Sequence, residues 1–339
     1  PSAAYLGYVD LRVLCLLFCL MAVVAGLQSC QLFSLMAQRL LSGKRSFRMV
    51  ALLLVLLPFF TSMLVTNDVS LITFVPFAIL VLQTIGRTEY LIPVIVLQTV
   101  AANLGSMATP VGNPQNLFLY ASYSLDAGSF FGVMVPLTLL SLCGLLASSL
   151  IFPKDAIQVD FTQRCTITGK RQLILYVVLF LLCLLSVFRV LHYGILTAIV
   201  AVLLLITDRK ILKRVDYFLL LTFVCFFVFA GNIGAIEQVK TFLEALLDRS
   251  AVLSSILASQ VISNVPAAVL LAGFTDDWHG LLVGTNLGGM GTLIASLASL
   301  ISFKFYAALP EAKSGRYLAV FTLVNVVGLL ILVPLSFLL

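Results

Sequence analysis

The sequence has few charged residues, one tryptophan and two histidines. Charged side chains make up 10% of the 339 residues and hydrophobic ones 61%, whereas a soluble domain carries roughly 25% charged residues. The seven cysteines form no CxxC pair, and no HExxH or GxSxG motif occurs. These absences argue against a soluble protein, a metal or redox cofactor and an enzyme. They favour an all-α polytopic membrane protein.

The net charge of +6 comes from short basic segments between apolar runs, which indicates membrane orientation rather than nucleic-acid binding. Residues 39–48 contain four basic and no acidic residues, whereas residues 237–249 contain three acidic and two basic ones. By the positive-inside rule, the first segment is cytoplasmic and the second is external. Since both follow an apolar run that contains Ala-Gly near its end, we expect two halves of inverted orientation in the lipid bilayer of a bacterial inner membrane.

One short motif occurs twice. Residues 103–109 read NLGSMAT, and residues 286–292, which lie 183 positions later, read NLGGMGT. Glycines in both stretches, together with Pro110 and Pro114 beside the first, disfavour a continuous helix. At membrane depth an unwound backbone is tolerated only where it is buried in protein or lines a cavity. Two matching breaks therefore predict the binding site of a transporter built from inverted repeats.

Each motif is preceded by two short apolar runs that polar residues join. These polar tips are residues 66–68 (TND) and 263–266 (SNVP), and the runs beside them are shorter than the roughly 20 residues of a full span. We therefore expect a re-entrant hairpin and then a broken helix in each half. The predicted units are a first repeat, 1–152, with tip 66–68 and break 105–114; a cytoplasmic linker, 153–171; and a second repeat, 172–339, with tip 263–266 and break 286–292.

Asp68 is the one carboxylate that this arrangement places in the apolar core. A charge there costs roughly 2.5–3.5 kcal/mol, so an acid at this position is by default a functional residue. We expect it to carry a proton or a cation. The structural alternatives are that Asp68 caps the returning helix and that Asn67 and Asn264 only cap short helices. For Ser296 and Ser299, helix packing through small residues is the alternative.

The candidate binding residues are the polar side chains at both tips and the polar and flexible positions of both breaks. Amides and hydroxyls bind anions or cations, and helix ends add partial charges of either sign. We expect Na+, bound at the tips, or H+ as the coupling ion, with no other metal and no cofactor. The set is Thr66, Asn67, Asp68, Gly105, Ser106, Thr109, Pro110, Gly112, Asn113, Asn116, Ser263, Asn264, Val265, Pro266, Asn286, Gly288, Gly289, Gly291, Thr292 and Ser296.

At residues 66–69 (TNDV), 109–116 (TPVGNPQN) and 263–266 (SNVP), the chain resembles the ion transporter superfamily. That superfamily includes the divalent anion–sodium symporters, the citrate transporters, the arsenite permease and the NhaD-type antiporters. The likeness is greatest to the YbiR-like branch and covers nearly the whole chain. It implies a homodimer in which a mobile transport domain moves against a scaffold domain as an elevator.

The resemblance also implies roles for the tips. In the divalent anion symporters, Ser-Asn-Thr tips bind substrate carboxylates and sodium, and Asn67 and Asn264 match the Asn of those tips. The run 109–112 and residues 288–291 match the segments that complete the ion sites. The third tip position departs from the pattern, because it is Asp68 in one half and Val265 in the other. An Asn-Asp tip is more similar to the arsenite and NhaD-type members.

The sequence thus predicts a secondary active transporter that moves a small anion with Na+ or H+ by alternating access. The alternative is a cation–proton antiporter or an arsenite-like oxyanion exporter in which Asp68 is the ion ligand.

Overall fold

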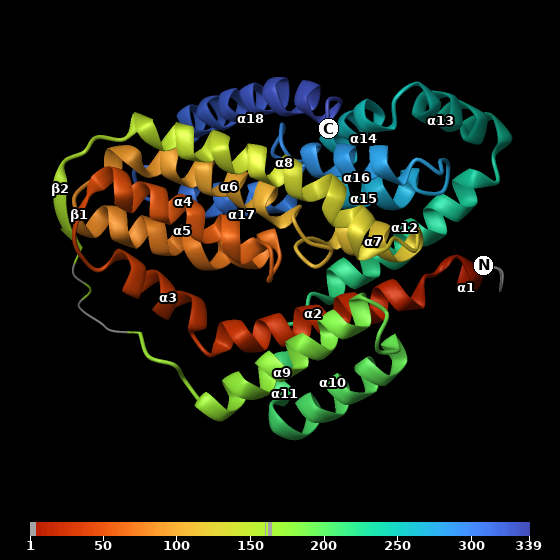
Figure 1. The fold of residues 1–339 in the computed structure, drawn as a ribbon, viewed down its shortest axis with the longest axis horizontal. Helices are drawn as coiled ribbons and strands as arrows, with labels where there is room; N and C mark the ends of the chain where they lie inside the picture. The colour runs from red at the N-terminus through yellow and green to blue at the C-terminus, as the bar shows by residue number, and fades with distance from the viewer. Residues whose placement is uncertain (1–4, 160, 162–164) are drawn as a thin grey trace.

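The protein is described by a computed structural model over residues 5–159, 161 and 165–339, and its helices run mostly along the long axis of the molecule (Figure 1). This part of the chain is helical except for loops and two short strands, β1 (Gly43–Ser46) and β2 (Ala156–Val159). The α-helices are α1 (Tyr5–Tyr8), α2 (Leu11–Ser29), α3 (Leu32–Leu41), α4 (Phe47–Ser62), α5 (Asn67–Thr84), α6 (Leu91–Ser106), α7 (Pro114–Ser122), α8 (Ala127–Ser148), α9 (Lys170–Val187), α10 (Tyr193–Thr207), α11 (Arg209–Leu212), α12 (Tyr217–Gly234), α13 (Glu237–Arg249), α14 (Ala251–Ile262), α15 (Asn264–Leu271), α16 (Trp278–Leu287), α17 (Leu297–Ala307) and α18 (Ser314–Ser336). Two short 3₁₀ helices, η1 (Thr88–Tyr90) and η2 (Ser149–Ile151), precede α6 and extend α8.

Six helices within the described residues are long and apolar enough to cross a membrane: α2, α5, α8 with η2, α9, α12 and α18. The predicted polytopic, helical fold is therefore confirmed. α5 is longer than the expected apolar run because it begins at the tip itself, at Asn67, and continues to Thr84. This hairpin arm alone is thus long enough to span a membrane.

The same order of elements occurs twice. A hairpin (α4 and α5), a broken helix (α6 and α7) and a long helix (α8) are followed, later in the chain, by α14 and α15, α16 and α17, and α18. The first hairpin opens at the end of the long axis where the strands lie, and the second opens at the opposite end, beside α13 (Figure 1). The tip of the first hairpin lies near the middle of that axis.

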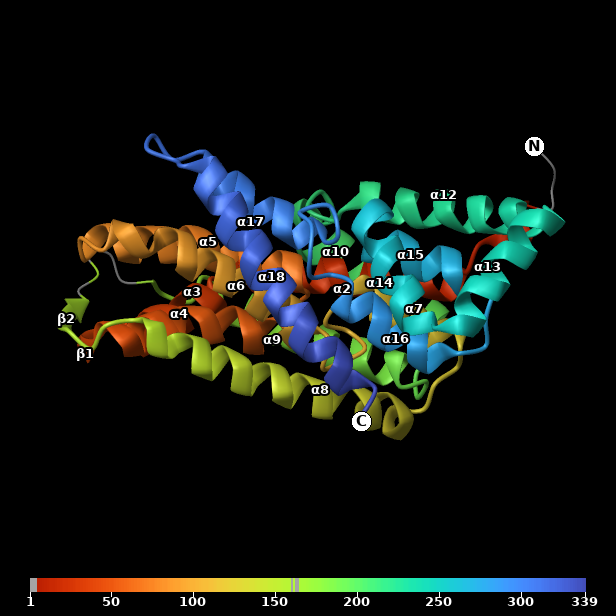
Figure 2. The same ribbon diagram turned by 90° about the horizontal axis from the view of Figure 1, so that it is seen from above.

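α6 lies at the centre of this assembly. Nearly all of its side chains are buried, as expected of a helix that is apolar on every face. It packs against α4, α5, α8, α17 and α18. α18 crosses the middle of the molecule obliquely (Figure 2) and also contacts α8, α16 and α17. The first predicted break, at the end of α6, therefore lies inside the protein.

A second group of helices forms a separate layer along one side (Figure 1). α2 packs against α9 and α10. This group contacts the first group of helices at two places, where α2 packs against α7 and where α12 packs against α15. Gly26 allows the close approach of α2 and α9, because a Cβ atom there would overlap the ring of Tyr176. The Tyr176 hydroxyl donates to Asp208 Oδ2 at 3.1 Å, which links α9 to the end of α10.

Two short strands, which the sequence analysis did not predict, lie outside the helical part of the fold. β1 and β2 are antiparallel, with Gly43 opposite Val159. Beyond the strands, the N–H of Phe47 donates to the carbonyl of Asp155 at 2.8 Å. The reason is that backbone donors and acceptors outside the helices still need partners. The pairing places the basic segment 39–48 and the linker side by side.

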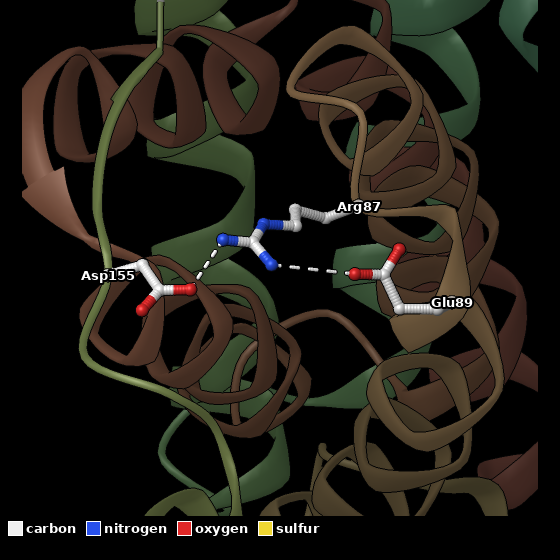
Figure 3. A network of polar contacts seen from close by, with 3 residues as sticks. All are labelled: Arg87, Glu89 and Asp155. Carbon is white, nitrogen blue, oxygen red and sulfur yellow. Dashed lines mark hydrogen bonds and ion pairs between the residues drawn. The ribbon is translucent and has the colours of Figure 1, made fainter.

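An ion-pair network fastens the linker to the end of the first hairpin (Figure 3). Arg87, just after α5, contacts Asp155 at 2.5 Å and Glu89 at 3.5 Å. The Arg87 guanidinium also lies over the ring of Phe47, 5.5 Å from its centre. These contacts join three segments that meet at the same end of the molecule.

Candidate transport site

The first helix break, residues 107–113, is closed by its own polar side chains. α6 ends at Ser106, and α7 begins at Pro114, a residue whose missing N–H and fixed φ suit the first helical position. Asn113 is the N-cap, and its Oδ1 accepts the N–H of Asn116 at 2.9 Å. Gly112 packs so closely that a Cβ atom there would overlap the carbonyl of Ser106. The turn is almost entirely buried, so it depends on these internal partners.

The first hairpin tip docks onto this break. At Thr66 the backbone has a φ of 51°, which turns the chain from α4 into α5. The N–H of Asn67 donates to the carbonyl of Gly112 at 3.2 Å. Its side-chain Nδ2 donates to Asn103 Oδ1 at 2.9 Å, and its Oδ1 accepts the N–H of Asp68 at 3.0 Å. Asn67 therefore has a local bond at the helix start and also links the tip to α6.

The second tip has the same geometry. Ser263 has a φ of 73°, and the N–H of Asn264 donates to the carbonyl of Ala295 at 3.0 Å. Asn264 Oδ1 accepts the N–H of Val265 at 3.0 Å. Ala295 lies 183 residues after Gly112, the same separation as that of the two NLG motifs. The two tips therefore dock on equivalent carbonyls.

A threonine in each break bonds to the hairpin beside it. Thr109 Oγ1 donates to the carbonyl of Met63, and Thr292 Oγ1 donates to the carbonyl of Gln260 at 3.2 Å. Both threonines and both acceptors are again equivalent positions of the two halves. Each break is thus held to its own hairpin by a matching pair of bonds.

Glycine permits the close approach of each hairpin to its broken helix. A Cβ atom at Gly105 would overlap the carbonyl oxygen of Phe59, and one at Gly288 would lie 2.6 Å from Ser259 Oγ. Gly291 is needed for another reason, because its φ of 114° is a conformation that other residues rarely adopt. Close packing and backbone conformation therefore explain three of the four glycines in the two motifs.

The second break is longer than predicted, and this is a correction. α16 ends at Leu287 and α17 begins only at Leu297, so the break extends to Ser296 rather than to Thr292. Ser296 has extended backbone angles at the N-cap position, with φ −142° and ψ 133°. It therefore starts the helix on which Ser299 lies.

Amide side chains connect the two breaks across the centre of the molecule. Asn113 Nδ2 donates to Asn286 Oδ1 at 3.0 Å, and Asn286 Nδ2 donates to Asn116 Oδ1 at 2.6 Å. In the other direction, Ser296 Oγ donates to Asn103 Oδ1 at 3.2 Å. Asn113 and Ser296 are equivalent positions, as are Asn103 and Asn286. The two halves therefore bond to each other reciprocally.

A cavity of about 430 Å³ lies beside the first tip and the first break, within the size range of ligand pockets. Of the predicted site residues, Thr66, Asp68 and Asn113 line it. Most of its remaining wall is apolar, and α2 and α17 supply more of these apolar side chains than the other elements do. The half-buried Asp68 thus has access to a space large enough for a small ligand.

Charges of both signs share this cavity with Asp68. Arg214 and Asp216 come from the segment between α11 and α12, and Lys304 comes from α17. Asp216 also caps α12, because its Oδ1 accepts the N–H of Leu219 at 2.9 Å. The arrangement suits an anion beside the two cations or a cation beside the two carboxylates.

The second tip and break are placed differently from the first. None of residues 263–266 and 286–296 is part of the wall of this cavity. Asn286 and Ser296 are buried in the central amide network, whereas Thr292 is exposed at the surface. The structure therefore brings most of the predicted polar residues together and leaves Thr292 outside.

Gln260 and Asn325 bond to the second break but are not among the predicted site residues. Gln260 Nε2 donates to the carbonyls of Gly288 and Met290 at 3.0 and 2.9 Å. Asn325 Oδ1 accepts the N–H of Gly291 at 3.3 Å. A signal was present in the sequence, since each is an uncharged polar residue within an apolar run.

Comparison with known proteins gives a consistent result. A family profile described as "Citrate transporter" matches residues 2–276. The chain is 32% identical over 318 residues to "Uncharacterized transporter MJ0456" of Methanocaldococcus jannaschii, covering 94% of this chain and 86% of that one. It is 32% identical over 302 residues to "Inner membrane protein YbiR" of Escherichia coli, covering 84% and 77%. A 95-residue match at 33% identity to "Putative transporter arsB" of Dictyostelium discoideum covers 28% of this chain and 16% of that protein.

Proposed function

Because the chain belongs to the citrate transporter family, we propose that it is a secondary active transporter that moves a small anion across the membrane together with Na+ or H+. The observation that carries the proposal is the meeting of two docked tips and two helix breaks, linked by buried amides, beside a cavity. Such breaks present helix ends and carbonyls to a ligand without exposing them to lipid. Neither a membrane enzyme nor a passive pore requires this matched pair.

The equivalent bonds support two inverted repeats, because both hairpin tips dock in the same way on the break beside them, while the two hairpins enter from opposite ends of the molecule (Figure 1). In this proposal the hairpins, the broken helices, α8 and α18 form a transport domain. That domain moves as an elevator against a scaffold of α2, α9, α10 and α12, which also carries the homodimer interface. The membrane is the bacterial inner membrane.

The charged residues of the cavity indicate the side of the membrane from which an anion enters it. Arg214 and Lys304 lie in the net-basic segments 209–214 and 304–316, which the positive-inside rule assigns to the cytoplasm. In this proposal the cavity therefore opens to the inside. The two cations attract an anion, which then meets Asn113 and the N-terminus of α7, where helix ends favour negative charge. Asp68, in the same cavity, couples the movement to a cation.

Purified protein in liposomes that enclose a pH-sensitive dye provides the test. A panel of anion gradients is imposed first, and a Na+ gradient without added anion second. Internal acidification that requires one particular anion is the result expected for proton-coupled uptake, and uptake of that radiolabelled anion only with external Na+ is the result expected for sodium coupling. Absence of anion flux under every gradient would contradict the proposal.

A second candidate function is a cation–proton antiporter or an arsenite-like oxyanion exporter. The observation that favours it is that two carboxylates, Asp68 and Asp216, line one cavity. The same vesicles separate the two functions, because external Na+ that exchanges for internal protons makes the lumen alkaline with no anion present. Asp68→Asn then abolishes all ion-driven flux in the antiporter, whereas the anion transporter keeps anion binding and changes its pH dependence.

A further inference from the structure

The turn between α9 and α10 contains an arginine at a position where glycine is usual. Arg189 has a φ of 65°, in the left-handed region that favours residues without a Cβ atom. The turn is a Schellman motif, since the N–H of Val190 donates to the carbonyl of Leu185 at 2.8 Å and the next bond inward is also made. Glycine would suit this backbone better, so the reason for an arginine must lie in what its side chain contacts.

The Arg189 side chain reaches the end of α7. Its Nη1 donates to the carbonyl of Ser124 at 3.0 Å, and its Nη2 donates to the carbonyl of Tyr120 at 3.4 Å. The guanidinium also lies over the Tyr120 ring, 5.8 Å from its centre. Tyr120 lies in the last turn of α7, and Ser124 follows that helix. Both acceptors therefore belong to the C-terminal end of a helix, where a cation is favoured.

These bonds differ in kind from the other contacts that α7 makes with the second group of helices. The Phe118 ring of α7 meets Phe223 and Phe227 of α12, with centroids 6.4 and 5.8 Å apart. Contacts between apolar groups are non-directional, so these rings can slide past one another. Hydrogen bonds require particular distances and angles. The bonds of Arg189 therefore specify one position of α7 against α9 and α10.

The position of these bonds along the membrane normal follows from the linker. α8 with η2 precedes the linker and α9 follows it, and each is long enough to cross a membrane. The start of α8 and the end of α9 are therefore both on the side of the membrane opposite the linker. The Arg189 bonds join these two ends. Because the positive-inside rule assigns the linker to the cytoplasm, the bonds lie on the external side.

The cavity of about 430 Å³ lies between the same two groups of helices. α2 supplies one part of its wall, and the first tip, the first break and α17 supply another. In the proposed function this cavity opens to the cytoplasm, so the two groups must be closed together on the external side. The Arg189 bonds are a contact between the groups on that side.

We propose that the bonds of Arg189 to the end of α7 hold the protein in the conformation whose cavity is open to the cytoplasm, and that they break each time the cavity opens to the outside. The inference rests on the proposed function, since it concerns the movement of the transport domain against the scaffold. It also accounts for the residue at this turn, because glycine would suit the backbone but could not reach α7.

A cysteine on the cavity wall can report which side the cavity faces. Val69 is half-buried, lines the cavity and lies next to the first tip. In a Val69→Cys protein, a membrane-impermeant thiol reagent added to intact cells labels the new thiol only when the cavity faces outward. The same reagent added to inside-out vesicles labels it when the cavity faces inward. Mass spectrometry of the labelled peptide separates this thiol from the native cysteines.

Arg189→Gly in this background removes the contact and suits the left-handed turn. The rate of labelling from outside should rise about fivefold or more, as expected for the loss of bonds to a charged group. The melting temperature should stay the same or rise, because the turn is no longer strained. Arg189→Asn also tolerates a left-handed backbone and should give the same rise in labelling. Arg189→Lys keeps the charge without the fork of donors, so its rise should be smaller.

Arg12→Gln is the matched control. Arg12 lies in the first turn of α2, near enough to Arg189 to interact with its charge, and within the described residues no hydrogen bond joins it to α7. The change removes one positive charge from the same region, so it shows any effect of charge on the local concentration of the reagent. Labelling from outside should change less than about twofold.

Three results would overturn the inference: unchanged external labelling in both Arg189→Gly and Arg189→Asn, an equal rise in Arg12→Gln, or a rise accompanied by a lower melting temperature in both Arg189 variants. The proposed function would survive each of them if the reporter were labelled from both sides, because the cavity would still alternate. Labelling from one side alone in every variant would contradict the alternating access as well.

Discussion

The two helix breaks share a backbone plan and differ in their surroundings. The first is almost entirely buried and is fastened by Asn116 from its own broken helix. The second leaves Thr292 and Ile294 exposed and is fastened to its hairpin by Gln260. The difference teaches that backbone geometry sets where a site can form in each half. The side chains decide which half has charge and access.

The largest effect is expected at the bonds that join the halves. Asn286→Ala leaves a buried donor of Asn113 and a buried acceptor of Asn116 without their partner, at about 1–3 kcal/mol each. The free energy of unfolding should therefore fall by about 2–6 kcal/mol. Melting in detergent with a thiol-reactive dye measures this, because Cys19 and Cys183 are buried in the folded protein.

A double-mutant cycle tests the pairing itself. If Asn113→Ala and Asn286→Ala act through one shared bond, the double variant should lose less free energy of unfolding than the two single variants lose together. The difference should be about 1 kcal/mol or more. Strict additivity would show that the two halves do not bond as described.

The next largest effect concerns the tips. Val265→Asp places a second carboxylate, at a position that is 9% exposed, where a charge costs roughly 2.5–3.5 kcal/mol. The melting temperature should fall at neutral pH, and the protein should express poorly. The matched change Asp68→Val removes a charge from the equivalent position and should leave the melting temperature unchanged or higher. Equal destabilisation by both changes would contradict the difference between the halves.

A smaller effect is expected where hairpin and broken helix touch. Gly105→Ala drives a methyl group into the carbonyl of Phe59, and such overpacking costs about 1–3 kcal/mol. Gly132→Ala in α8 is the control, since a Cβ atom there meets nothing within 4 Å. The control should gain up to about 1 kcal/mol from helix propensity. A Gly105→Ala protein as stable as this control would mean that the close approach is absent.

The smallest effect is expected at the ion pairs that fasten the linker. Arg87→Ala removes the contacts with Asp155 and Glu89, both of which are more than half exposed. Exposed ion pairs contribute little and are screened by salt, so the melting temperature should fall by about 2 °C or less. The difference in melting temperature between Arg87→Ala and the unmodified protein should become smaller still in 1 M salt. A large, salt-resistant loss would show that the linker position controls the hairpin.

The two tips could be predicted because polar residues interrupt apolar runs at 66–68 and 263–266. The breaks could be predicted because glycine and proline disfavour a continuous helix. The family assignment was carried by the same residues and is confirmed. The extension of the second break to Ser296 could not be foreseen, because residues 293–296 contain neither glycine nor proline. Docking of Asn264 on Ala295 accompanies the unwound backbone there.

By itself the sequence determined the helical membrane fold, the duplicated order of elements and the places where the backbone unwinds. The length of an apolar run and the backbone conformations that glycine and proline favour depend on residues close together in the chain. They can therefore be read from the sequence. Only the tertiary structure decided which amide meets which partner. Asn113 and Asn286 are separated by 173 positions, and an amide has donors and an acceptor that any suitable neighbour can satisfy. In the same way, only the structure shows that Gln260 bonds to the carbonyls of Gly288 and Met290 in the second break.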